Sequence, residues 1–246
     1  DLGGIPADLP LTGNNAYGHP ELVRRIAARY GIGEDRVLPV TGSSMGNFLV
    51  AAACVEPGKR IVVEQPAYEP LLRVVESCGW KIVRVRRRME NGWTVDPGEI
   101  GAASLVILTN LHNPSGAALP PATVKACAES GATLLVDEVY LDSAFRAKVE
   151  PAVTLAENAV STSSLTKSYG LGGLRAGWVA GPAKLIQRMK EIRDSLDVLN
   201  SYPNDILSLQ AWDRREALLA LAKRRFDENW PVVAAWLKAR PDWRCT

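Results

Sequence analysis

The sequence of 246 residues has few of the residues that build metal sites and disulfides. Its only two histidines, His19 and His112, lie far apart, and its four cysteines are widely spaced without a Cys-x-x-Cys pair. Zinc sites and disulfide frameworks need such residues at short, regular spacings. The sequence therefore predicts a protein without a metal site or a disulfide framework, in a reduced, cytoplasmic setting.

Excess charge and long apolar runs are also missing. The 29 basic and 27 acidic residues give a formal net charge of only +2, so nothing favours binding to nucleic acid or to an anionic membrane. No apolar run reaches the roughly 18 residues of a membrane-spanning helix. One cationic cluster, KIVRVRRR at residues 81–88, has apolar residues at alternate positions. This pattern predicts a strand with one solvated face, and we assign it no function.

The pattern along the chain is typical of an α/β protein. Short β-branched runs near residues 60–64, 81–85, 104–109 and 133–136 alternate with amphipathic segments of helical length at 69–77 and 121–129. Several of these runs are apolar throughout, as in parallel strands covered on both faces. We therefore predict a mostly parallel sheet with helices on both faces and a ligand site at the carboxyl ends of the strands.

Further helices are predicted on either side of the sheet region. Pro20 is typical of the first turn of a helix, here one that runs to Tyr30, and another helix is expected after Pro182. Residues 205–239 have a helical pattern with few breaks. Pro231 is expected to interrupt or kink this last helix because proline lacks a backbone N–H.

Four segments carry more specific information. They are STSSLTKSYGLGGLRAGW at 161–178, TNLHNPSG at 109–116, LLVDEVY at 134–140 and VTGSSMGNFLVAAACV at 40–55. Taken singly, they are as well explained by a surface lysine, an ordinary turn, an acidic strand end and a helix N-cap. In this order and at these spacings, they resemble the class I/II aminotransferases, which depend on pyridoxal phosphate (PLP). The resemblance implies the large domain of an aspartate-aminotransferase-like protein of fold type I.

The resemblance assigns catalytic roles to three residues. It implies that Lys167 carries PLP as a Schiff base and then moves the substrate proton, as a positioned amine can. Asp137 is expected to keep the pyridine nitrogen protonated, since a close negative charge favours that form. Tyr140, together with Asn113, is expected to hydrogen-bond the phenolate oxygen of the ring.

The same resemblance implies which residues hold the rest of the cofactor. Ser43 and Ser44 follow a glycine at a helix start, where backbone N–H groups and hydroxyls are available to a phosphate. Arg175 is expected to add a forked, permanent positive charge and Ser164 a hydroxyl. Tyr68, in QPAYEP, is expected to stack on the face of the ring, with core packing as the alternative.

Relatives also imply a homodimer, because their active sites form at a subunit interface. Tyr17 lies where they place a tyrosine that reaches the phosphate of the neighbouring subunit, although the pattern here favours capping and packing of the helix after Pro20. Many relatives have a cis peptide bond in the loop that corresponds to TNLHNPSG. The Asn113–Pro114 bond is therefore expected to be cis.

The resemblance becomes thin after residue 181. Relatives continue into a small domain with an arginine that holds the substrate carboxylate, and neither Arg240 nor Arg244 matches it. We therefore expect residues 1–15 to be a remnant of an N-terminal segment and 16–225 to be the PLP-binding large domain. Residues 226–246 are expected to be a connecting helix and the start of a small domain that is largely missing. Such a chain is expected to bind PLP, to turn over amino acids poorly and to leave its last tryptophans partly uncovered.

The implied function is the transfer of an amino group between an amino acid and a 2-oxo acid. Relatives specific for dicarboxylic substrates use a second arginine near the segment that corresponds to residues 194–204. That segment contains none, so an acidic substrate is disfavoured. PLP-dependent lyases and synthases of the same fold share every motif above, and some transcription regulators carry an aminotransferase-like sensor domain. Both alternatives stay open.

Overall fold

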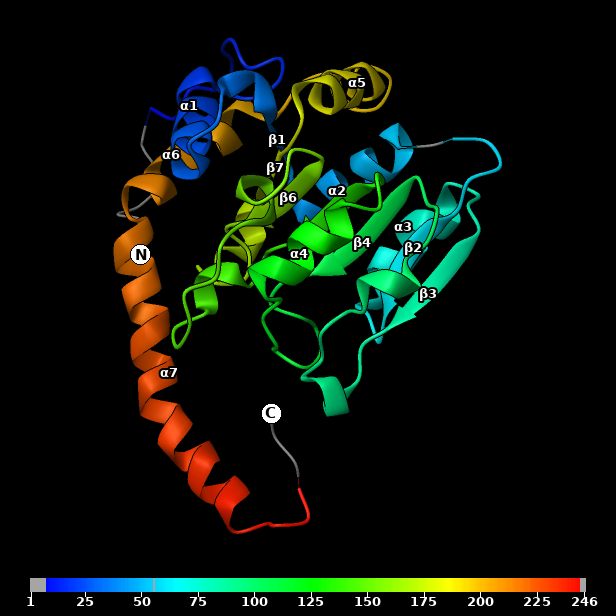
Figure 1. Cartoon of the computed structure of the whole chain (residues 1–246). Helices are drawn as coiled ribbons and strands as arrows, with labels where there is room; N and C mark the ends of the chain where they lie inside the picture. Colours follow the sequence, from blue (N-terminus) through cyan, green and yellow to red (C-terminus); the bar gives the residue numbers. More distant parts are fainter. Residues whose placement is uncertain (1–7, 55, 244–246) are drawn as a thin grey trace.

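The computed structural model describes residues 8–54 and 56–243, so parts of the predicted segments 1–15 and 226–246, with Arg244, lie outside the described residues. A seven-stranded sheet forms its centre in the order β1-β7-β6-β5-β4-β2-β3 (Figure 1). The strands are β1 (Val37–Thr41), β2 (Ile61–Gln65), β3 (Ile82–Arg86), β4 (Leu105–Thr109), β5 (Thr133–Asp137), β6 (Ala159–Ser164) and β7 (Ala176–Ala180). β7 is antiparallel to both of its neighbours, and the other pairs are parallel. The predicted mostly parallel sheet is confirmed.

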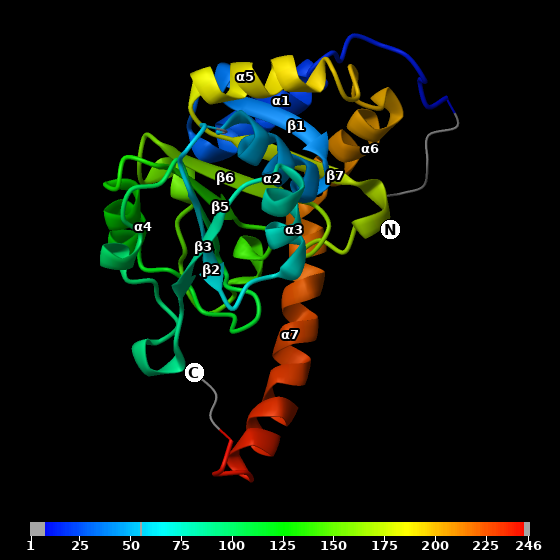
Figure 2. The same ribbon diagram turned by 90° about the vertical axis from the view of Figure 1, so that its right-hand side faces the viewer.

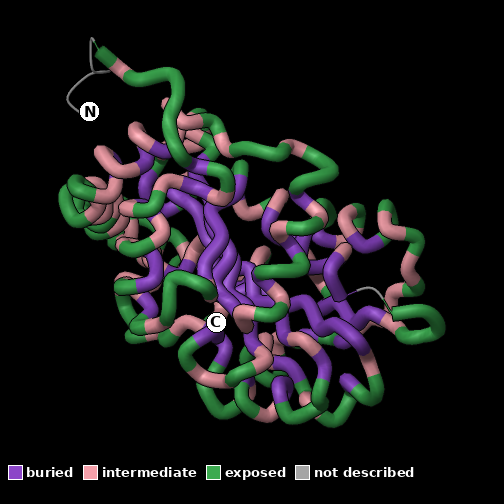
Figure 3. Tube along the Cα trace, turned by 90° about the horizontal axis from the view of Figure 1, so that it is seen from above, coloured by how far each residue is buried: buried purple, intermediate pink, exposed green. Residues whose placement is uncertain are grey.

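Helices cover both faces of this sheet. They are α1 (Pro20–Tyr30), α2 (Gly42–Ala53), α3 (Glu69–Ser77), α4 (Pro121–Ala128), α5 (Ala183–Arg193), α6 (Tyr202–Asp213) and α7 (Arg215–Lys238). Successive strand residues point to opposite faces. Ile61 and Val63 pack with residues of α2, α3 and α5, whereas Val62 packs with residues of α4. Figure 3 shows the result, a buried bundle of strands inside an exposed outer layer.

The helix predicted from Pro20 to Tyr30 is confirmed, and its ends show why it forms there. His19 is its N-cap, where Nδ1 accepts a hydrogen bond from the backbone N–H of Glu21, and Pro20 opens its first turn. Gly31, with a φ of +65°, ends it in the left-handed conformation that glycine adopts without strain. His19, and not Tyr17, therefore caps this helix.

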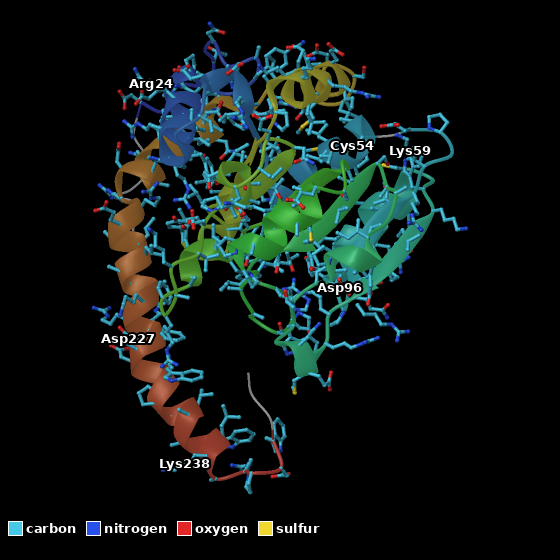
Figure 4. The ribbon with its side chains drawn as sticks, viewed as in Figure 1. Arg24, Cys54, Lys59, Asp96, Asp227 and Lys238 are labelled. Carbon is cyan, nitrogen blue, oxygen red and sulfur yellow. The ribbon has the colours of Figure 1, made fainter. Side chains whose placement is uncertain are left out.

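The last predicted helix is continuous where a break was expected. Pro231 lies inside α7, so it does not interrupt the helix; the alternative, a kink, stays a prediction. Proline removes one backbone hydrogen bond, but no residue of α7 is buried, so solvent can satisfy the carbonyl that is freed. Figure 2 shows α7 leaving the body of the molecule, and Lys238, labelled in Figure 4, lies beyond the sheet. Trp236 and Trp243 are exposed, as expected.

The cationic cluster at 81–88 forms the strand β3 as predicted, but one of its arginines is not on a solvated face. The Arg87 side chain is fully buried and pairs with Glu64 of β2, whose side chain is buried as well. The alternating pattern ends at Arg86, where β3 ends, and this explains the error. No helix among the described residues is long and apolar enough to cross a membrane.

Candidate active site

A pocket of about 230 Å³ opens at the carboxyl ends of the parallel strands, the edge that the sequence predicted. Its lining residues come from the segments that follow β2, β4, β5 and β6, from the start of α2 and from the residue before β7. They are Ser43, Ser44, Tyr68, Thr109, Leu111, Asn113, Asp137, Val139, Tyr140, Ser164, Thr166, Lys167 and Arg175. Every residue that the sequence predicted for the site therefore lies in this one pocket.

One part of the pocket is suited to an anion. α2 begins at Gly42, so Ser43 and Ser44 lie in its first turn, where backbone N–H groups have no partner within the helix. The Arg175 guanidinium lies so close to Gly42 that an added methyl group there would collide with it. A Cβ at Gly177 would lie 2.7 Å from the backbone nitrogen of Ser43. Two glycines thus allow the arginine and the helix start to lie side by side, as phosphate sites require.

Asp137 provides a buried negative charge at the end of β5. Its Oδ2 accepts a hydrogen bond from Asn47 Nδ2 at 2.7 Å, and its Oδ1 accepts one from the backbone N–H of Val139 at 3.2 Å. Burial raises the pKa of this carboxyl, and the hydrogen bond from Asn47 opposes that rise. Among the described residues Asp137 has no ion-pair partner. A cationic group bound in the pocket would supply one.

The neighbouring carboxyl group does not compete for this role. Glu138 is buried on the side of the strand away from the pocket lining, where its Oε1 accepts a hydrogen bond from the backbone N–H of Ala152 at 2.7 Å. Burial raises the pKa of Glu138 to about 8, which leaves the group largely neutral at pH 7. Asp137 is therefore the carboxylate that faces the site.

Asn47 is the residue of this network that the sequence did not predict. Its Oδ1 accepts a hydrogen bond from Thr162 Oγ1 at 2.7 Å, which directs its amide toward Asp137. Asn47 is separated from Asp137 by 90 residues, and only the packing of α2 on β5 and β6 brings them together. A buried asparagine in the otherwise apolar part of a helix was the one signal available in the sequence.

Lys167 lies in the turn that follows β6. The turn is closed by a hydrogen bond from the backbone N–H of Gly170 to the carbonyl of Lys167, and Leu165 and Tyr169 are buried on either side of it. The hydroxyl of Ser164, the last residue of β6, accepts a hydrogen bond from the backbone N–H of Thr166. Two buried anchors thus hold the lysine at the pocket while its own side chain stays exposed.

The Asn113 loop is held to the loop that carries Tyr68. His112 Nε2 lies 3.0 Å from the carbonyl of Pro66 and must donate to it, so Nδ1 accepts from Ser115 Oγ at 2.7 Å. Burial lowers the pKa of His112 to about 4, which keeps the ring neutral. Tyr68 itself is 45% exposed at the pocket, so the alternative that it packs in the core is wrong.

Two further expectations are corrected. The cis peptide bonds of the described residues are Gln65–Pro66 and Asn110–Leu111, so the expected cis bond at Asn113–Pro114 is wrong. The turn that contains Asn113 and Pro114 needs no cis bond, because a hydrogen bond from the Gly116 N–H to the carbonyl of His112 closes it. Tyr17 does not line the pocket of its own chain; its hydroxyl donates to the Asp194 carboxylate at 3.0 Å.

Comparison with known proteins decides the family. The family model of aminotransferase class I and II matches residues 13–211. The chain belongs to this family. It is 32% identical over 207 residues to arginine–pyruvate transaminase AruH of Pseudomonas aeruginosa, covering 75% of this chain and 53% of that one. It is also 32% identical over 236 residues to capreomycidine synthase of Streptomyces vinaceus, covering 91% and 60%. The solved structure of the PLP-dependent cyclase OrfR superposes with a TM-score of 0.86 at 27% identity, covering 100% and 68%.

PLP is the cofactor of this family, and the pocket residues of this aminotransferase-family chain fit it. Asp137 is a buried carboxyl group that forms no ion pair with the described residues, so it is available to a protonated ring nitrogen. Arg175 beside the start of α2 suits a phosphate, and Lys167 offers a primary amine in the same pocket. The chain spans about half the length of the curated relatives it matches.

Proposed function

We propose that the chain is the PLP-binding part of an aminotransferase, which moves an amino group between an amino acid and a 2-oxo acid. The observation that carries the proposal is one pocket that combines a lysine amine, a buried carboxylate and an arginine beside a helix start. In this proposal residues 16–225 are the cofactor-binding domain, and its boundary with 226–246 falls inside α7, which continues as the connecting helix.

The charges of the pocket match the charges of the cofactor. Asp137 holds the ring nitrogen, and the phosphate is bound by Ser43, Ser44, Ser164 and Arg175. Bound PLP supplies a ring that withdraws electrons from the substrate α-carbon. Lys167 would hold the cofactor through its primary amine and, when that amine is free, would move the α-proton of the substrate. Asn113 and Tyr140 hydrogen-bond the ring oxygen, and Tyr68 covers one face of the ring.

A second candidate is a synthase or cyclase that uses the same cofactor chemistry. Capreomycidine synthase and the cyclase OrfR match 91% and 100% of this chain. The pocket residues fit both functions, because both need PLP held by the same groups. A homodimer, a cytoplasmic location and a substrate that is not dicarboxylic stay predictions.

Visible absorption spectra test the leading proposal. PLP added to the chain should give the absorbance of a lysine-bound imine, and an amino acid should shift it and release a 2-oxo acid. Release of ammonia or of a cyclised product in place of a 2-oxo acid would favour the second candidate. A spectrum that no amino acid shifts would contradict both enzyme proposals and favour the sensor domain.

Asn47→Leu should weaken PLP binding by about tenfold, since a hydrogen bond to a charged group contributes about 1.5–3 kcal/mol. Leucine has a similar size, so the packing of α2 is kept while the amide that donates to Asp137 is lost. Fluorescence titration with PLP measures the affinity. Thr162→Val should give a smaller loss, because it keeps the amide that donates to Asp137 and removes only the hydrogen bond that orients this amide. Equal affinities of Asn47→Leu and the parent chain would contradict the role of Asn47.

A further inference from the structure

A buried ion pair lies beside the pocket and has no part in the proposed chemistry. Glu64 is in β2, and Arg87 directly follows β3. Arg87 Nη1 donates to Glu64 Oε2 at 2.7 Å, and both side chains are 0% exposed. Arg87 also donates from Nε to the carbonyl of Trp93 and from Nη1 to that of Thr109. Two carbonyls and a carboxylate thus accept from Nε and Nη1, whereas Nη2 is buried without a hydrogen-bond partner among the described residues.

One threonine connects this ion pair with the site. Thr109 Oγ1 donates to Glu64 Oε1 at 2.5 Å, and the same hydroxyl accepts the backbone N–H of Asn113 at 3.2 Å. A hydroxyl has one proton and two lone pairs. Because the carboxylate can only accept, the Thr109 hydroxyl donates its hydrogen bond to Glu64. Its lone pairs then stay available to the backbone N–H of Asn113. The charge on Glu64 therefore sets the orientation of a hydroxyl that lines the pocket.

Packing alone gives no reason for charges at this position. Two buried charges lose their hydration, and apolar side chains of similar volume stabilise a fold as well or better. An apolar pair would offer no acceptor to Thr109, however, and would leave its hydroxyl free to rotate. The distinctive effect of the ion pair is that it fixes the orientation of the Thr109 hydroxyl, which accepts the hydrogen bond from the Asn113 N–H.

We propose that Arg87, Glu64 and Thr109 are positioning residues that hold the Asn113 backbone where its side chain can reach the cofactor. The inference rests on the proposed function, in which Asn113 contacts the ring oxygen. His112 holds the other side of the same loop through Pro66 and Ser115. Loss of the Thr109 hydrogen bond should therefore free the start of the loop and leave the turn at Gly116 in place.

Amide hydrogen exchange in the cofactor-free chain tests this directly. In Thr109→Val the Asn113 amide should exchange about tenfold faster, as expected for the loss of one hydrogen bond. Thr109→Ser keeps the hydroxyl and should restore the parent rate. The Gly116 amide, which donates to the carbonyl of His112, is the internal control and should not change. An unchanged rate at Asn113 in Thr109→Val overturns the inference.

A double-mutant cycle on PLP affinity shows whether Thr109 acts through Asn113. Thr109→Val should weaken binding by several-fold in the parent chain and have no further effect in Asn113→Ala. Additive losses would mean that Thr109 acts on the cofactor by itself, which overturns the inference. If Thr109→Val does not fold, Thr109→Ala, which also removes the hydroxyl, takes its place in both measurements with the same expected outcomes. A parent chain that binds no PLP overturns the proposed function, whereas the exchange rates still decide whether the loop is held.

Discussion

Lys167→Ala is expected to abolish covalent attachment of PLP. Borohydride reduction of the parent chain with PLP should fix one cofactor to the peptide that contains Lys167, because only a primary amine forms the bond that borohydride reduces. With alanine at this position the trapped cofactor should fall to background. Peptide mass spectrometry after proteolysis measures both the amount and the site. This is the largest effect expected from any single substitution in the pocket.

Lys184→Ala is the matched control for this experiment. Lys184 is exposed on α5, away from the pocket lining, so its loss should leave the trapped cofactor at the parent level. PLP reacts slowly with surface lysines, and the control measures that background. Covalent cofactor in Lys167→Ala at the parent level would refute the assignment of Lys167.

Arg87→Met is expected to lower the free energy of unfolding by about 3–5 kcal/mol, the usual cost of removing one partner of a buried ion pair. Methionine fills a similar volume, but Glu64 is left as an unpaired carboxylate in the interior. Burial raises the pKa of Glu64, and loss of the arginine raises it further. A group whose pKa is raised in the folded state stabilises the folded protein at low pH, and this stabilisation is lost as the pH rises. The loss of unfolding free energy in Arg87→Met should therefore be largest near pH 7. It should become smaller as the pH is lowered to the ordinary glutamate pKa of about 4.3.

Urea unfolding measured at both pH values tests this expectation, with two further variants for comparison. Arg86→Met removes the exposed arginine next in sequence and should change the unfolding free energy by less than about 0.5 kcal/mol. The double variant Glu64→Met with Arg87→Met removes both charges and should recover most of the loss. Equal stabilities of Arg87→Met and Arg86→Met would show that Arg87 has no special role in the fold.

The cationic cluster and the last helix show where sequence patterns misled. Alternation in KIVRVRRR located β3 correctly, but it could not tell that Arg87, one residue past the strand, meets Glu64 from the neighbouring strand. The proline at 231 predicted an interruption or a kink, yet α7 continues through it, because a helix with no buried residue tolerates one missing hydrogen bond. Both errors concern the surroundings of a residue, which local patterns do not contain.

The sequence by itself predicted β2, β3, β4 and β5, most of the helices around them and, through its resemblance to the family, the pocket residues, with Lys167 foremost; it did not predict β1, β6 and β7 as strands. The location of the site followed from the apolar runs, because the carboxyl ends of parallel strands meet at one edge of a sheet, whereas the pocket residues followed from the resemblance. Only the tertiary structure decided what supports them: Asn47 behind Asp137, His112 between two loops, and the Glu64–Arg87 pair behind Thr109. These contacts join residues far apart in the chain, and packing of helix on strand and of strand on strand brings them within hydrogen-bonding distance.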